Sequence, residues 1–145
     1  MLPDEGVEVL SANSPDQRYK LVFDGYQSVS EEDGEMSIGG DVDSAPLLID
    51  LRDSVSNRFE SCGTPCGYDW GVWLSSDRFA LGGWSELDAA GSRFQGTLGI
   101  YSIPDSTVAM YETKPVSSEA YAAYRSAWEK WMGGRYWAKK RQAAR

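Results

Sequence analysis

Tyr19-Lys20-Leu21-Val22-Phe23 is the stretch of the sequence that most directly indicates the fold. Side chains of a β-strand point alternately to its two faces, so Tyr19, Leu21 and Phe23 share one face of a half-buried strand. Similar β-rich runs bounded by turn residues predict further strands at Val7–Leu10, Leu47–Leu51, Trp70–Leu74, Phe79–Trp84, Thr97–Ile103 and Thr107–Tyr111.

Turn residues lie between several of these runs. Ser14-Pro15-Asp16, Ser75-Ser76-Asp77 and Pro104-Asp105-Ser106 each carry side chains that bond to nearby backbone, and two of them contain a Pro that presets φ. Consecutive strands joined in this way form antiparallel hairpins.

The periodicity changes after Pro115. Ser117 or Ser118 is a suitable helix cap, and Glu119 falls in the first turn, where the helix dipole favours an anion. Gly133-Gly134 is expected to end the helix. An aromatic stripe at three- and four-residue steps is expected to pack on the sheet; its members are Tyr121, Tyr124, Trp128 and Trp131.

The chain is therefore predicted to be one domain, residues 1–145, of the mainly β (α+β) class. Residues 1–113 form an antiparallel meander of hairpins, 117–132 an amphipathic helix packed on the sheet, and 133–145 a basic tail that frays in solvent.

Two segments about 60 residues apart resemble each other. Ser14–Phe23 and Leu74–Leu81 share a Ser/Asp turn, an Arg, an aromatic residue and a strand, and each precedes a second strand, at Pro46–Leu51 and Leu98–Ile103. The pattern resembles the strand-turn-strand units of TolB-type or WD40-like propeller blades. Two copies cannot close a propeller, so the resemblance implies a blade-like open meander with the helix on a face or edge.

Charge is distributed unevenly. Residues 1–50 carry 12 acidic and 2 basic side chains, whereas residues 114–145 carry 2 acidic and 8 basic ones, and the formal net charge is −8. An acidic body repels nucleic acid and steers a basic protein partner toward it. No run approaches the roughly 20 apolar residues of a membrane span, and Met1-Leu2-Pro3-Asp4-Glu5 lacks the features of a signal peptide.

Two cysteines lie in Cys62-Gly63-Thr64-Pro65-Cys66, and the chain has no histidine. A zinc site needs further Cys or His ligands, and a thioredoxin-type site needs two intervening residues, so we expect a structural Cys62–Cys66 disulfide. A disulfide favours a periplasmic or otherwise extracytoplasmic location, with any signal sequence removed.

The lack of histidine excludes Ser-His-Asp and Cys-His hydrolysis, and no Gly-rich phosphate loop is present. Acidic residues gather in what we expect to be solvated loops, which would contact an electropositive partner or, alternatively, bind calcium or supply a carboxylate acid/base pair. These residues are Glu31, Glu32, Asp33, Glu35, Asp41 and Asp43.

Three tryptophans form a second candidate set. Trp70 and Trp73 are three positions apart, so in a strand they point to opposite faces. Trp84 follows Gly82-Gly83. Core packing is the ordinary role of each, and an exposed one would anchor a protein interface or stack on a sugar ring.

These features favour a non-catalytic protein-binding module of the bacterial envelope over an enzyme. The chain is similar in general character to the immunity proteins that neutralise secreted cell-wall-degrading toxins. The alternatives are a carbohydrate-binding accessory domain that uses an exposed Trp, and a carboxylate-dependent hydrolase. We expect no cofactor, apart from calcium at the acidic loops as an option.

Overall fold

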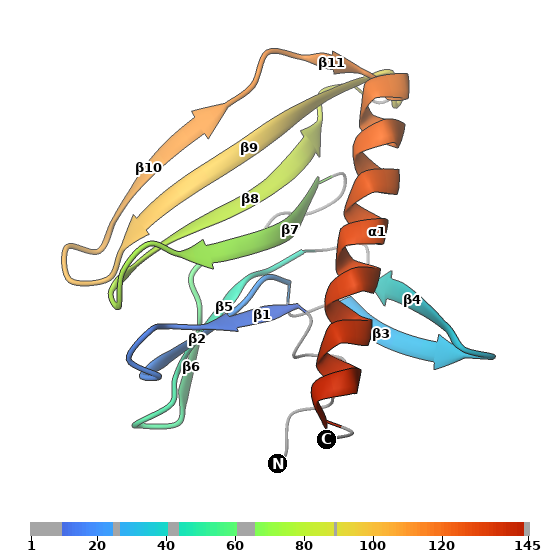
Figure 1. Ribbon diagram of the computed structural model, residues 1–145. Coiled ribbons are helices and arrows are strands. Elements are labelled where there is room, and N and C mark those ends of the chain that lie inside the picture. Colours follow the sequence, from blue (N-terminus) through green and yellow to red (C-terminus); the bar gives the residue numbers. More distant parts are fainter. Residues whose placement is uncertain (1–9, 25–26, 41–43, 61–65, 89, 144–145) are drawn as a thin grey trace.

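The structure, a computed structural model, describes residues 10–24, 27–40, 44–60, 66–88 and 90–143. Its secondary structure confirms the mainly β prediction: antiparallel strands precede a C-terminal helix that packs against them (Figure 1). The strands are β1 (Ser11–Asn13), β2 (Tyr19–Val22), β3 (Gln27–Glu32), β4 (Glu35–Gly40), β5 (Leu47–Asp50), β6 (Val55–Arg58), β7 (Cys66–Trp73), β8 (Arg78–Glu86), β9 (Arg93–Ser102), β10 (Thr107–Glu112) and β11 (Val116–Ser117), and the helix is α1 (Ser118–Ala143).

Two antiparallel sheets form the body. The first has the order β1-β2-β5-β6, and the second has the order β10-β9-β8-β7 with the short β11 also paired to β9. The two similar sequence segments occupy the same place in their sheets. Ser14–Phe23 forms the turn between β1 and β2 together with β2, and Leu74–Leu81 forms the turn between β7 and β8 together with the start of β8. Neither sheet closes into a barrel or a propeller within the described ranges. The propeller-blade resemblance itself stays a prediction.

The hydrophobic core lies between the two sheets. Leu21 and Phe23 are fully buried, and both pack over Gly71, where a Cβ atom would lie 2.6 Å from Leu21 Cδ2. On the facing side, in the second sheet, the rings of Phe79 and Tyr101 stack with their centroids 4.9 Å apart. Burying each such side chain contributes about 1.5 to 3 kcal/mol, so this layer is the main source of stability for the two sheets.

Helix α1 begins where the sequence predicts but ends much later. Ser117 Oγ accepts a hydrogen bond from the Ala120 amide at 3.2 Å, which is an N-cap. The helix continues through Gly133-Gly134 to Ala143, so the predicted end at residue 132 is wrong, as is the frayed basic tail over 133–143. Each glycine costs a helix about 1 kcal/mol relative to alanine, which packing of the second half offsets.

The buried stripe of α1 also differs from the prediction in one position. Tyr121 and Tyr124 are partly buried, and Trp128 is buried as expected, but Trp131 is 45% exposed. Met132 and Tyr136 continue the buried face instead, in steps of four residues.

A buried carboxylate joins α1 to β7. The register of β7 against β8 shifts between Tyr68 and Trp70, which leaves Asp69 as the extra residue of a β-bulge. Asp69 Oδ1 lies 2.8 Å from Arg125 Nη1, and Asp69 Oδ2 accepts a hydrogen bond from the Tyr124 hydroxyl at 2.5 Å. The Asp69 carbonyl accepts a third bond, from Trp128 Nε1, at 2.9 Å. Burial raises the pKa of Asp69, against the opposing effect of Arg125 and Tyr124.

Removing this carboxylate should destabilise the protein strongly. Asp69→Ala leaves the Arg125 guanidinium and the Tyr124 hydroxyl without their acceptor, and we expect a loss of about 2 to 3 kcal/mol in the free energy of unfolding, measured by urea denaturation. Arg18→Gln, which breaks the more exposed Arg18–Asp50 pair, is the matched control and should cost much less. Equal losses in the two variants would contradict the anchoring role of Asp69.

Candidate functional site

The acidic stretch Glu31–Glu35 is a β-hairpin, which corrects the prediction of a solvated loop. Strands β3 and β4 pair from Gln27↔Gly40 to Glu32↔Glu35, and Asp33-Gly34 forms the two-residue turn. Both turn residues have positive φ, 52° and 79°, as a type I′ turn requires. The Asp-Gly pair is the sequence signal that could have predicted this hairpin. We call residues 27–40 the acidic hairpin.

The acidic hairpin is an insertion between β2 and β5, closed at its base. Asp24 and Ser44, which flank it, are both buried, and Ser44 Oγ donates a hydrogen bond to Asp24 Oδ2 at 2.5 Å. The Tyr68 amide in turn donates to Ser44 Oγ at 3.2 Å. The hairpin extends away from both sheets beside the C-terminal half of α1 (Figure 1).

Contacts with α1 hold the acidic hairpin in place. The Tyr136 hydroxyl and the Lys140 ammonium both donate hydrogen bonds to Glu31 Oε2. On the apolar side, Met36 Cε lies 3.8 Å from the position that a Cβ of Gly133 would occupy. The contact explains in physical terms why the helix continues past Gly133-Gly134, since its second half packs on the hairpin.

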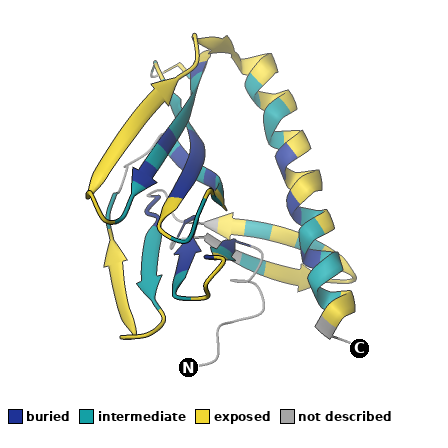
Figure 2. Cartoon of the chain, turned by 60° about the vertical axis from the view of Figure 1, so that its left-hand side comes forward, coloured by how far each residue is buried: buried dark blue, intermediate teal, exposed yellow. Residues whose placement is uncertain are grey.

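The electrostatics of this contact shift two pKa values. Hydrogen bonds from Lys140 and Tyr136 lower the pKa of Glu31 below its ordinary value of 4.5. The bond to Glu31 raises the pKa of Lys140 to about 12. The other three carboxylates, those of Glu32, Asp33 and Glu35, are exposed, so the tip of the hairpin presents negative charge to solvent (Figure 2).

The three predicted tryptophans do not form one cluster. Trp70 and Trp73 lie on opposite faces of β7, as predicted. Trp73 is partly buried and packs against the core, and its Nε1 donates a hydrogen bond to the Ala12 carbonyl at 2.8 Å. Trp84 lies under the start of α1, with its ring centroid 5.0 Å from that of Tyr121. Neither Trp73 nor Trp84 is an exposed anchor.

Trp70 lines a groove between β7 and α1. Its ring covers Gly82, where a Cβ atom would lie only 2.1 Å from Trp70 Cε2, so this cross-strand glycine permits the ring's position. The Arg135 guanidinium lies 4.9 Å from the centroid of the Trp131 ring. The groove has a volume of about 510 Å³ and is mainly aromatic; its lining includes Trp70, Tyr124, Trp128, Trp131 and Arg135.

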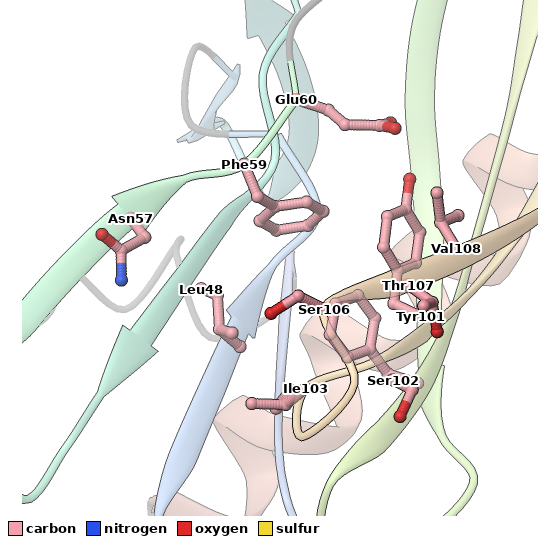
Figure 3. Close-up of a pocket in the computed structure, with 11 residues that line it drawn as sticks. Leu48, Asn57, Phe59, Glu60, Tyr101, Ser102, Ile103, Ser106, Thr107 and Val108 are labelled. Carbon is pink, nitrogen blue, oxygen red and sulfur yellow. The ribbon is translucent and has the colours of Figure 1, made fainter.

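A pocket that the sequence did not predict opens between the two sheets (Figure 3). Its volume is about 340 Å³, and Phe59 and Glu60 of the segment after β6 face Tyr101 of β9 across it. The Tyr68 hydroxyl donates to Glu60 Oε2 at 3.1 Å. Burial first, and then the Glu60 carboxylate, raise the pKa of both Tyr68 and Tyr101, so these phenols remain protonated donors.

Several predicted residues lie outside the described part of the chain. Asp41 and Asp43 do, so their share in a calcium site or a partner surface stays a prediction. Cys66 begins β7, but Cys62 is not described, and the disulfide stays a prediction. Among the described residues, no three Cys, Asp or Glu side chains lie close enough together to hold a metal ion. Helix α1 is not apolar enough to cross a lipid bilayer.

Comparisons of the chain with protein-family models, curated proteins and solved structures found no match.

The contact between the acidic hairpin and α1 should weaken in acid. Because the pKa of Glu31 is lowered in the folded state, its stabilising effect is present above 4.5 and is lost as the pH falls through the lowered value. We expect the protection factors of the amides in residues 27–40 to fall over that range, measured by hydrogen–deuterium exchange and corrected for the pH dependence of intrinsic amide exchange. Glu31→Gln should remove the acid-dependent step, whereas Glu32→Gln should retain it. A step that persists in Glu31→Gln would show that another group is responsible.

Proposed function

We propose that this chain is a non-catalytic protein-binding module of the bacterial envelope, of the immunity or inhibitor type, and that the acidic hairpin contacts a basic partner. The observation that carries the proposal is the placement of Glu32, Asp33 and Glu35 at the exposed tip of a projecting hairpin. Adjacent strands are only about 5 Å apart, so a two-stranded hairpin is narrow enough to enter the cleft of an enzyme.

The way the hairpin is held supports this function. Its base is closed by the Asp24–Ser44 bond, and its side is fixed to Tyr136 and Lys140. A preorganised hairpin loses less conformational entropy on binding than a free loop, which improves affinity. Its exposed carboxylates would steer a positively charged partner and accelerate association at low salt.

An envelope location rests on the predicted Cys62–Cys66 disulfide. Mass spectrometry of protein from its native compartment, with and without reductant, should detect one disulfide. Two free thiols in that protein would remove the support for export.

Neutralising the hairpin tip should abolish binding to the partner. The test compares affinity capture from a native envelope extract at low salt, using the wild type and the triple variant Glu32→Gln, Asp33→Asn, Glu35→Gln. Asn is well tolerated in a type I′ turn, so the hairpin should persist. We expect the wild type to retain one basic protein in stoichiometric amount, released by salt, and the variant to lose it.

A control variant distinguishes the effect of the three hairpin carboxylates from the effect of the net charge. Asp53→Asn, Glu112→Gln and Glu129→Gln remove three carboxylates from exposed sites on other elements and should leave capture unchanged. Equal capture by the hairpin variant, or no stoichiometric partner for the wild type, would contradict the proposal.

Carbohydrate binding is the second candidate, and one observation favours it. Trp131 is 45% exposed and lines, together with Trp70, the groove between α1 and β7. Aromatic rings on a groove are suitable platforms for sugar rings. Trp131→Ala should abolish glycan-array binding if this candidate is correct, whereas it should leave capture of a protein at the hairpin unchanged.

A further inference from the structure

The inter-sheet pocket combines an apolar interior with one carboxylate. Phe79 and Tyr101, which are 2% and 8% exposed, are its most buried lining residues, and Leu48, Ile103 and Val108 contribute aliphatic lining. Glu60 lies at one end, with its carboxylate directed toward the Tyr101 hydroxyl (Figure 3). A volume of about 340 Å³ is at the small end of ligand sites.

The Glu60 carboxylate has hydrogen-bond donors but no counter-ion in the described structure. The two neighbouring phenols are neutral, because burial and Glu60 raise their pKa values. None of the ion pairs within the described ranges involves Glu60. Of the 14 Lys and Arg residues, only Arg145 lies outside those ranges, and residues 61–65, which follow Glu60, contain none.

This arrangement fits one chemical class of ligand. A partly buried carboxylate is stabilised by a cation that forms charge-assisted hydrogen bonds with it. The aliphatic and aromatic walls fit an apolar stem, and the faces of Phe59 and Tyr101 attract positive charge. An anionic ligand would be repelled by Glu60.

We propose that the inter-sheet pocket binds an ammonium or guanidinium group carried on an apolar stem, with Glu60 as its counter-ion. The cation comes either from a Lys or Arg side chain of a protein or from a free small amine. The pocket lies on the side of β6 and β10, away from the acidic hairpin, so this site does not depend on the function proposed for the hairpin (Figure 1).

The test is a titration of the full chain followed by amide NMR chemical shifts. The probes are n-pentylamine and n-butylguanidine, with n-pentanol and pentanoate as the neutral and anionic controls of similar stem. We expect at least one cation to bind in the millimolar range and to shift residues that line the pocket, and n-pentanol to bind about tenfold more weakly. Pentanoate should not bind.

Two variants establish the role of the carboxylate. Glu60→Gln retains an oxygen that accepts from Tyr68 and should weaken cation binding about tenfold, while n-pentanol binding stays the same. Glu112→Gln, an exposed carboxylate at the far end of β10, is the matched control and should change neither. Should Glu60→Gln fail to fold, the affinities of the wild type for a cation and for n-pentanol still show whether the pocket prefers a cation.

The capped tripeptides Ac-Gly-Lys-Gly-NH₂ and Ac-Gly-Arg-Gly-NH₂ distinguish the two sources of the cation. Binding of a tripeptide at the pocket residues assigns the site to a protein side chain, and binding of the small cations alone assigns it to a free amine. Equal affinity for n-pentylamine and n-pentanol, unchanged cation affinity in a folded Glu60→Gln variant, or no shifts with either cation would overturn the proposal.

Discussion

Asp69 is the buried charge on which the arrangement of the helix depends. The bulge in β7 directs this side chain at α1, where Arg125 and Tyr124 bind its carboxylate and Trp128 binds its carbonyl. A buried pair of this kind contributes little relative to an apolar contact, but breaking one side of it is costly. These three bonds all reach residues 124–128, so they fix the rotation and the height of that part of α1 against β7.

The two ends of α1 then serve different parts of the molecule. Tyr121 stacks on Phe94 of the second sheet with ring centroids 3.9 Å apart, whereas Tyr136 and Lys140 bind Glu31 of the acidic hairpin. Because α1 contacts both parts, the position of the acidic hairpin, which lies outside both sheets, depends on how the helix packs on the second sheet. The inter-sheet pocket is on the other side, where the exposed strands β6 and β10 leave the core partly open (Figure 2).

Local signals predicted most of the body. The run Tyr19–Phe23 and the turns Ser14–Asp16 and Ser75–Asp77 specify strands and hairpins through nearby residues alone, and they were predicted well. The acidic hairpin has a local signal in the Asp33-Gly34 turn, but its run of acidic residues is more typical of a solvated loop. The helix end was wrong because a contact between residues about 100 positions apart, Glu31 and Tyr136, overrides the propensity of Gly133-Gly134. The pocket at Glu60 depends on the packing of two sheets, which no local pattern encodes.

The most direct test removes the cation of the Asp69–Arg125 ion pair and measures hydrogen exchange in the acidic hairpin. In Arg125→Met the apolar stem is kept, but Asp69 loses its cation. Hydrogen–deuterium exchange should then become faster in α1 and, at a distance, in residues 27–40, while β8 and β9 keep their protection. Unchanged protection of residues 27–40 in that variant would contradict the claim that the Asp69 anchor positions the acidic hairpin through the helix.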